Sequence, residues 1–473
     1  MKQWVGKLAT VLMAILGPAL ACAQRAPATA QAPWQGPTSL HLPPKPSSVI
    51  VPDPSKVYTL PELVNLAEQN NPDTRVAWEN AKVRAAELGI SKSTLYPTVA
   101  ALATGETSRV NIFFSPNYIR QTAYTFSPAV ELEYTIFDFG RRSAEIAVSR
   151  NNLLSANFLF NDTHRKVIFD VMAAYYRVLN TKGQEDAAEA NLKNAQTDQQ
   201  AAEARLQLGL ATLPDVLEAQ SAAAQADYDL QAALGASEIA RGDLNTALGV
   251  SPATPLQVES IQSLKIPEDL TTTVESSIDT ALSQRPDLMQ RVAELRASAA
   301  EVKEAKSAYL PTLTVGGQAG LAKTFTTQTP GTGLYSDNQE TWVAQLNLKW
   351  TLFDGFAREQ RLARAKAAQK QAAADIDAMR DQVENEVWSA YSTARTALRQ
   401  QKAAAALLAA ATSSYNAAVQ SYSYGVRSQI DVVSAQRTLA AARTADVSAR
   451  TNLLTGIAAL AFQTGDLLHT KGP

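Results

Sequence analysis

The sequence predicts a mainly α-helical protein of two similar halves, each of which adds one β-hairpin to a barrel in a membrane. Three observations predict this fold class. Short motifs recur at an offset of 214 residues around two prolines and of 216 residues after them. Within each half, the spacing of apolar residues changes from a helical period to alternation. Each half then contains about 68 residues without proline, enough for a helix of roughly 100 Å at about 1.5 Å per residue.

The repeated motifs define the two halves. Pro97 returns as Pro311, and Gly209 returns as Gly425. The longest motif, Phe137-Asp138-Phe139-Gly140, returns as Phe353-Asp354-Gly355-Phe356. A repeat of this length exceeds a solenoid unit and indicates a duplicated half-molecule. We therefore expect a first repeat over residues 58–250, a linker over 251–272, a second repeat over 273–468 and a tail over 469–473.

The N-terminus has the pattern of a secretory signal peptide over residues 1–23. Lys2 and Lys7 flank the start of an apolar stretch, and small residues place the cleavage site near residues 21–23. Cys22 has two interpretations: it is the acylated first residue of a bacterial lipoprotein, or it is removed with the signal. Residues 24–57 are rich in proline and alanine and predict an extended arm. We therefore expect the protein to work outside the cytoplasm.

The composition argues against several classes of function. A formal net charge of −2 gives no electrostatic case for binding nucleic acid. Three scattered histidines and one cysteine argue against a metal centre. The chain has no nucleophile elbow, phosphate loop or histidine cluster, so we expect neither an enzyme nor a cofactor.

Each half begins with a helical pattern and continues with a predicted β-hairpin. The helical pattern breaks at Asn71-Pro72-Asp73 in the first half and at Arg285-Pro286-Asp287 in the second. Pro97 and Pro311 end it, and alternation then predicts hairpins over about 98–137 and about 312–353. We expect long polar loops at 108–124 and 323–340.

The alternation predicts one apolar and one polar face for the last strand of each hairpin. In the second copy, Trp342, Ala344, Leu346, Leu348, Trp350 and Leu352 alternate with polar residues such as Gln345 and Asn347. In the first copy, Val130, Leu132, Tyr134 and Ile136 alternate with Glu131, Glu133 and Thr135. Strands of about 10–13 residues suit a tilted membrane crossing. A soluble hairpin with one wet face is the alternative, but aromatic residues at the strand ends favour membrane-interface girdles.

Long helices follow the hairpins directly. We expect them over about 140–248 and about 356–464, with one turn each at Gly209 and Gly425, because glycine is favoured just past a helix end. Abundant alanine permits the close helix contacts of a coiled-coil barrel. Alanine is also the best helix former, so the alternative is that these segments are ordinary helices that form no coiled-coil barrel.

Four strands per chain cannot close a barrel, and an open strand edge is not tolerated in lipid. Two chains would give eight strands, whose interior is filled by side chains, and three chains would give twelve, which can be hollow. The polar inward-facing residues favour a wet lumen. We therefore expect a homotrimer whose 12-stranded β-barrel continues into an α-helical barrel.

The chain carries these motifs in the same order in both halves. Over roughly residues 58–468 it therefore resembles the TolC-like outer-membrane efflux proteins. The resemblance implies a homotrimer in the bacterial outer membrane with a long periplasmic portion, closed at its periplasmic end by coiled-coil tips. It also implies contact with outer-membrane lipid and two kinds of partner, a periplasmic adaptor protein and an inner-membrane pump.

The function that the resemblance implies is a passive exit duct of a tripartite efflux system, which conducts drugs or toxic small molecules out of the cell. The alternative within the same class is export of a protein or peptide by a type I secretion system, and the sequence does not separate the two. A remote alternative is an extracellular coiled-coil scaffold or adhesin, which predicts no membrane strands.

The resemblance assigns gate roles to four residues at the helix tips. Arg427 and Tyr422 would hold the closed state, with Asp215 as a partner of Arg427. Asp431 would belong to a ring of carboxylates at the constriction. The family often has a second acid one turn later, but here that position is Ser434, so we expect a less acidic constriction.

The two tip carboxylates also have a structural interpretation. Thr212-x-x-Asp215 and Ser428-x-x-Asp431 both match the capping box, in which an acid at the third helical position bonds back to the start of the helix. An acid in the first turn is further favoured by the helix dipole. Asp138 and Asp354 are likewise interpreted as caps of the long helices and not as a catalytic pair.

Overall fold

The computed structural model describes residues 49–468, apart from 115–116, 262–263, 265, 271 and 330–333. These residues lie in one compact unit. The predicted signal peptide with Cys22, most of the predicted arm and the predicted tail lie outside the described residues.

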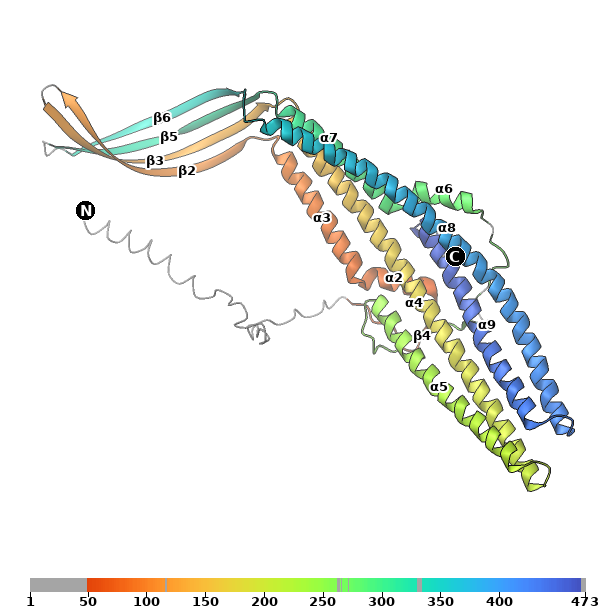
Figure 1. Cartoon of the computed structure of the whole chain (residues 1–473). Coiled ribbons are helices and arrows are strands. Elements are labelled where there is room, and N and C mark those ends of the chain that lie inside the picture. The colour runs from red at the N-terminus through yellow and green to blue at the C-terminus, as the bar shows by residue number, and fades with distance from the viewer. Residues whose placement is uncertain are drawn as a thin grey trace. The chain divides into compact units, whose positions relative to one another are not determined.

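The two halves contain the same elements in the same order (Figure 1). The first half contains α2 (Leu60–Asn70), α3 (Pro72–Ser93), β2 (Thr98–Phe114), β3 (Asn117–Phe137), α4 (Arg141–Gln207) and α5 (Leu213–Ala247). The second contains α6 (Val274–Gln284), α7 (Pro286–Ser307), β5 (Thr312–Thr329), β6 (Leu334–Lys349), α8 (Ala357–Ser423) and α9 (Gln429–Thr464). β1 (Val57–Tyr58) pairs in parallel with β4 (Gln257–Val258), and a short turn, η2 (Asp466–Leu468), follows α9. The helices α4 and α8 have 67 residues each, which supports the duplication.

The four long strands form one antiparallel sheet in the order β2-β3-β5-β6 (Figure 1). The prediction of long polar loops was wrong, because pairing continues to Phe114 opposite Asn117 and to Thr327 opposite Leu334. The residues in these segments are rich in Thr, Tyr, Phe and Gln, and ladder pairing uses backbone groups whatever the polarity of the side chains. The strand ends that were predicted from side-chain polarity therefore lie at the wrong residues.

The second hairpin ends earlier than predicted. β6 stops at Lys349, so Trp350 and Leu352 do not continue its alternation. The indole nitrogen of Trp350 donates a hydrogen bond to the carbonyl of Tyr309 at 3.1 Å. This bond ties the end of the hairpin to the segment that enters it.

The helices form a layer in which α7 packs against both α4 and α8, whereas α3 packs against α4. In Figure 1, α3 and α8 therefore lie on opposite sides of α4 and α7. A core cluster that includes Leu63, Val171, Tyr175 and Leu244, all fully buried, joins α2, α4 and α5. Burial of such side chains contributes roughly 1.5–3 kcal/mol each.

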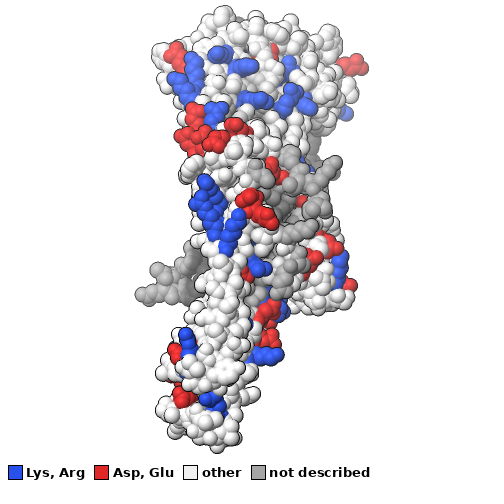
Figure 2. Space-filling model, turned by 90° about the vertical axis from the view of Figure 1, so that its right-hand side faces the viewer, with Lys and Arg blue, Asp and Glu red and all other residues white. Residues whose placement is uncertain are grey.

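Charged residues are grouped along α8. Five basic residues lie between positions 358 and 370, and five acidic residues follow between 375 and 386. Figure 2 shows one face of the molecule, on which Lys and Arg form a band near one end with a group of Asp and Glu beside it, whereas the two kinds are mixed elsewhere. Glu359 and Arg380 interrupt the two segments, so each also carries one residue of the opposite charge.

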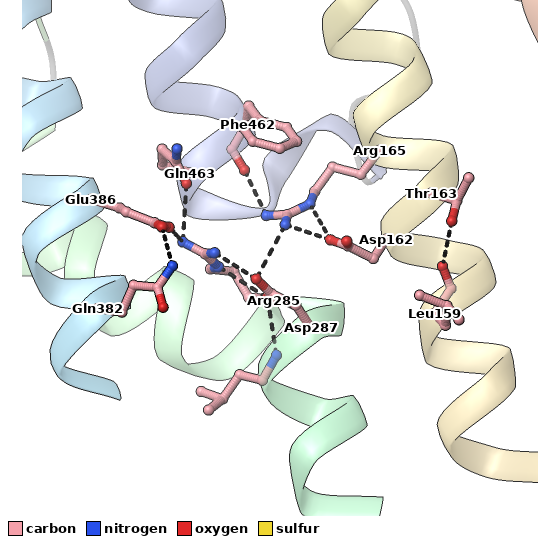
Figure 3. A network of polar contacts seen from close by, with 11 residues as sticks. Leu159, Asp162, Thr163, Arg165, Arg285, Asp287, Gln382, Glu386, Phe462 and Gln463 are labelled. Carbon is pink, nitrogen blue, oxygen red and sulfur yellow. Dashed lines mark hydrogen bonds and ion pairs between the residues drawn. The ribbon is translucent and has the colours of Figure 1, made fainter. Parts of the chain in front are cut away.

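Two buried arginines join α4, α7, α8 and α9 in one network (Figure 3). Arg285, 3% exposed, is paired with Asp287 and, at 2.7 Å, with Glu386. Arg165, 2% exposed, is paired with Asp162 and lies 3.5 Å from Asp287. Because Asp287 contacts both guanidinium groups, removing it would leave two buried cations undercompensated, which costs several kcal/mol in such networks.

Gly320 allows β3 and β5 to approach. A Cβ atom there would lie 2.4 Å from the carbonyl oxygen of Pro128 and 2.6 Å from the Cβ of Ala129. Backbone cannot yield as a flexible side chain can, so only glycine fits this position.

We expect Gly320→Ala to disturb the β3–β5 pairing and to reduce the amount of protein assembled in the membrane. Gly105→Ala is the matched control, because a Cβ atom at Gly105 meets nothing within 4 Å. The measurement is the yield of folded protein in isolated membranes. Equal yields of the two variants would contradict the close approach at Gly320.

Candidate functional site

The register of the sheet brings apolar residues of all four strands to one face. Leu132 of β3 lies opposite Val99 of β2 and Gly317 of β5, and Gly317 lies opposite Ala344 of β6. Directly opposed residues of antiparallel strands share a face. The same face carries Ala101, Val130, Tyr134, Val315, Ala319, Trp342, Leu346 and Leu348. It will be called the apolar face.

The opposite face is polar. Glu131, Glu133, Gln318, Gln345 and Asn347 line a shallow hollow on it, and the rest of the hollow is lined mainly by neighbouring residues of the same strands. The alternation predicted for the last strand of each hairpin is thus present in β3 and β6, and the register places β2 and β5 in step with them. One face suits hydrocarbon and the other suits water.

Charged residues of the strands are divided between the faces. Of the five carboxylates in the four strands, Glu106, Glu131, Glu133 and Asp337 lie on the polar face and Glu340 lies on the apolar face. Of the four basic residues, Arg109, Arg120 and Lys323 lie on the apolar face, towards the hairpin ends, and Lys349 lies on the polar face. A water-filled interior formed by the polar face would therefore attract cations.

The carboxylates Asp138 and Asp354 fasten the sheet to the long helices. Asp138 accepts hydrogen bonds from the backbone N–H of Arg142 at 3.0 Å and from its Nε at 2.8 Å. Asp354 accepts one from the backbone N–H of Arg358 at 3.1 Å. These contacts satisfy free N–H groups at the helix starts, so the structural interpretation of both acids is confirmed.

The helix tips lie at the far ends of α4, α5, α8 and α9, where Gly209 and Gly425 adopt positive φ angles of 69° and 76°. Both predicted capping boxes are present. Asp215 accepts bonds from the backbone N–H and hydroxyl of Thr212 at 2.8 and 2.7 Å. Asp431 accepts the equivalent bonds from Ser428 at 3.0 and 2.9 Å.

These hydrogen bonds stabilise the charged form of both tip acids. The backbone N–H and hydroxyl of Thr212 lower the pKa of Asp215 below its usual value. The equivalent groups of Ser428 lower the pKa of Asp431, with a smaller contribution from Arg427. Both carboxylates therefore remain negative at neutral and mildly acidic pH.

The structure joins the two tips through a residue that the sequence did not single out. The guanidinium of Arg205, in the last turn of α4, lies over the ring of Tyr422 at 4.6 Å from its centroid. Its Nη1 donates to the carbonyl of Ser423 at 3.3 Å. The sequence feature that could have identified Arg205 is a basic residue near a helix C-terminus. Such a residue usually indicates only a favourable interaction with the helix dipole.

The four predicted gate residues are only partly brought together. Tyr422 lies close enough to Arg205 and Asp215 for both charges to affect the pKa of its hydroxyl, which burial raises. Arg427 is exposed, and no ion pair between Arg427 and Asp215 is present among the described residues of the single chain. Within one chain, Arg205 and not Arg427 makes the contact between the tips.

The described residues contain no helix that is long and apolar enough to cross a membrane. They also contain no group of three or more His, Cys, Asp or Glu residues that could hold a metal ion.

Comparison with known proteins places the chain in a family. The family model described as outer membrane efflux protein matches residues 63–250 and 277–466, and the two segments correspond to the two halves. The chain is a member of the outer membrane efflux protein family. It is therefore an outer-membrane channel of an efflux system and not an enzyme, as the sequence predicted.

Individual relatives agree with this assignment. The chain is 28% identical over 343 residues to Protein CyaE of Bordetella pertussis, covering 71% of this chain and 69% of the relative. It is 24% identical over 402 residues to the probable efflux pump outer membrane protein TtgC of Pseudomonas putida, covering 84% and 80%. It is 23% identical over 387 residues to the cation efflux system protein CusC of Escherichia coli K12, covering 80% of each.

Solved structures show the same fold. The CmeC outer membrane channel of Campylobacter jejuni superposes with a TM-score of 0.72 at 21% identity, covering 86% of this chain and 85% of the other. The outer membrane protein VceC of Vibrio cholerae superposes with a TM-score of 0.70 at 18% identity, covering 86% and 96%. Family membership places this chain in the bacterial outer membrane, with its helices on the periplasmic side.

We expect Arg205→Ala to loosen the contact between the tips. The substitution removes the guanidinium over Tyr422 and the donor to Ser423 while leaving both capping boxes in place. The measurement is amide hydrogen exchange, which should become faster at residues 421–428. Arg437→Ala is the control, because the side chain of Arg437 is 70% exposed and lies 4.0 Å from Glu218. Unchanged exchange in Arg205→Ala would show that the contact does not hold the tips.

Proposed function

We propose that three copies of the chain close the four-stranded sheets into a 12-stranded barrel and form the exit duct of a tripartite efflux system. The observation that carries the proposal is the division of the sheet into an apolar face and a polar, acidic face. Such a sheet fits a membrane only when lipid covers one face and water the other.

The edges of the sheet support assembly. β2 and β6 are the edge strands of the described sheet, so each has one row of backbone groups available to a further strand. Backbone groups in lipid must be paired, so β6 of one copy would join β2 of the next. Twelve strands leave a hollow interior, whereas eight would be filled by side chains.

For the tips, we propose that Arg427, Tyr422 and Asp215 hold the closed state of the assembled duct, with Arg205 as an additional contact within each chain. Asp431 would line the constriction, where three copies contribute three carboxylates. The exposure of Arg427 in the single chain is consistent with a contact that forms only between copies. The capping boxes give both acids a structural role as well.

The proposed partners are a periplasmic adaptor protein and an inner-membrane pump. A groove of about 770 Å³ between α5 and α9, with α4 beside it, is lined largely by alanine, including Ala226, Ala233 and Ala440. Small side chains let another helix approach closely, so this groove suits a helical segment of an adaptor.

For the substrates, we propose drugs or other toxic small molecules, as the names of relatives such as an antibiotic efflux pump outer membrane protein of Pseudomonas putida suggest. The named cation efflux relative and the acidic polar face favour cations as a further class. Type I export of a protein remains the alternative, and acylation of Cys22 remains a prediction.

The test of the proposed function is the assembly and conductance of the purified mature protein. It should be a trimer in detergent and form water-filled, cation-preferring channels in planar lipid bilayers. A monomer that keeps its β-signal in circular dichroism would contradict closure by assembly.

We expect Leu348→Arg to impair membrane assembly more than Asn347→Arg. The first places a charge on the apolar face, at a cost of about 2–4 kcal/mol near the bilayer midplane, and the second places it on the face assigned to water. The measurement is the fraction of trimer in isolated outer membranes. Equal tolerance would mean that the faces are assigned wrongly.

Two variants at the tips distinguish a residue that holds the tip closed from a residue that selects ions. Arg427→Glu should bring a carboxylate towards Asp215, loosen the closed tip and raise conductance. Asp431→Ala should leave the tip closed but weaken cation preference, because one change removes three carboxylates from a trimer. If both variants keep wild-type conductance and selectivity and only lower thermal stability, the two residues have a purely structural role.

A further inference from the structure

Both hairpins carry a basic residue at the same position of the apolar face. Arg109 of β2 corresponds to Lys323 of β5 at an offset of 214. The register agrees with this correspondence, because Arg109 lies opposite Thr122 and Lys323 lies opposite Asn338, the equivalent of Thr122 at an offset of 216. A charge on a face that suits hydrocarbon is costly at the bilayer midplane and tolerated near the bilayer surfaces. The level of these residues in the membrane therefore decides what they can do.

Both residues lie at the level where the apolar band of a membrane barrel ends. Val99 and Arg109 on β2 are ten residues apart, as are Leu313 and Lys323 on β5. At about 3.4 Å per residue and a tilt of about 40°, ten residues rise roughly 25 Å, which is the height of such a band. This end of the sheet lies away from the helices (Figure 1), so it is the outer end. The two basic side chains thus lie near the headgroups of the outer leaflet.

Aromatic side chains of β3 support this level. From the hairpin end inwards, the apolar face of β3 carries Tyr118, Arg120, Thr122, Tyr124 and Phe126. The two tyrosines are 51% and 44% exposed. Tyrosine is enriched at membrane–water interfaces, where its ring contacts apolar groups and its hydroxyl contacts polar ones. Arg120 lies between these tyrosines, so it too belongs to the headgroup region.

In the first hairpin, the two arginines are neighbours. Arg120 lies opposite Asn111, which makes it a diagonal neighbour of Arg109 across the β2–β3 ladder. Diagonal neighbours lie about 7–8 Å apart, within reach of long side chains. Nε of Arg109 donates to the hydroxyl of the buried Thr122 at 3.0 Å. This bond orients the guanidinium and leaves both of its Nη groups without a partner among the described residues.

The second hairpin keeps the first basic residue and lacks the second. Ser336 stands at the equivalent of Arg120, and Glu340 stands at the equivalent of Tyr124. Ser336 and Glu340 are the diagonal neighbours of Lys323, whose Nζ also lies 5.3 Å from the ring centroid of Phe325. The second hairpin therefore offers one cation with a carboxylate beside it. On the described apolar face of the first hairpin there are two arginines and no carboxylate.

We propose that Arg109 and Arg120 bind a phosphate monoester on the headgroup of an outer-leaflet glycolipid. The proposal rests on the proposed assignment of the apolar face to lipid and adds a binding site to it. A phosphate monoester carries a charge of about −1.5 to −2 at neutral pH, which two guanidinium groups match. Arginine pairs with phosphate through two parallel hydrogen bonds, and Tyr124 lies where the acyl chains of the same lipid begin. A trimer has three such sites.

Native mass spectrometry of the mature trimer in detergent tests the site, with lipid A as the probe. The wild-type trimer should bind up to three molecules of lipid A. Arg109→Gln with Arg120→Gln should weaken this binding by about tenfold or more, because charged hydrogen-bonding groups are lost. Lys323→Gln is the matched control, because it removes the equivalent charge of the second hairpin. It should change the binding of lipid A little.

Two further probes identify the ligand. Phosphatidylglycerol carries a phosphate diester with a single negative charge, so it should bind more weakly than lipid A. Inorganic phosphate at equal concentration should not displace lipid A, because it lacks the acyl chains that contact the apolar face. Equal binding of phosphatidylglycerol would overturn the choice of a monoester. Displacement by inorganic phosphate would overturn the choice of a lipid.

The outcomes separate the site from the assembly. A double variant that binds lipid A as tightly as the wild type, or a wild-type trimer that binds none, would overturn the site while leaving the proposed function intact. A wild-type protein that is monomeric would instead contradict the proposed trimer. If the double variant does not assemble, Arg120→Gln alone serves as the test, because Arg120 is exposed. Undiminished binding in that variant would overturn the site.

The heat resistance of the trimer provides an independent test. A ligand that binds only the assembled protein stabilises it, so lipid A should raise the temperature at which the wild-type trimer dissociates. The increase should be absent in Arg109→Gln with Arg120→Gln and present in Lys323→Gln. Arg109→Lys with Arg120→Lys should show a reduced increase, because lysine keeps the charge and loses the planar fork. An equal increase in the wild type and the double glutamine variant would overturn the proposal.

Discussion

The backbone of a strand in lipid must be paired on both edges, and most of this structure depends on that requirement. In the described sheet, β3 and β5 are paired on both edges, whereas β2 and β6 are each paired on one edge only. Pairing also fixes which residues share a face, so it separates Leu132, Val315 and Leu346 from Glu131, Glu133 and Gln345. One register therefore sets both the apolar face and the polar face of the sheet.

The long helices extend this arrangement because they start at the strand ends. Asp138 and Asp354 lie where the sheet meets α4 and α8, and each carboxylate accepts a hydrogen bond from a backbone N–H in the first turn of its helix. Further along, the two halves differ. Arg285 balances Asp287 and Glu386 in the second half, whereas Asn71 occupies the equivalent position in the first. In the first half, burial raises the pKa of Asp170, Lys166 opposes this shift, and Asp73 adds to it.

Local patterns in the sequence predicted most of the elements. Proline at positions 72 and 286 fixed the starts of α3 and α7, and the capping boxes at Asp215 and Asp431 fixed the tips, because each depends on residues a few positions apart. The ends of the strands were missed because ladder bonds form between backbones and are insensitive to side-chain polarity. Arg205 was missed because its partner, Tyr422, lies 217 residues away and is found only after packing.

Duplication also bears on how the proposed ring of copies would close. Contacts between copies in a ring are head-to-tail, and they close only when each step turns through the right angle. In a single chain, the packing of α7 on α4 already sets one such step between the halves. If the contact between copies repeats that step, three chains of two halves make six similar steps, and the angle that closes the ring is set within each chain. The halves are then free to diverge where a covalent neighbour would be replaced by a separate copy, and the equivalent positions Arg285 and Asn71 already differ in this way.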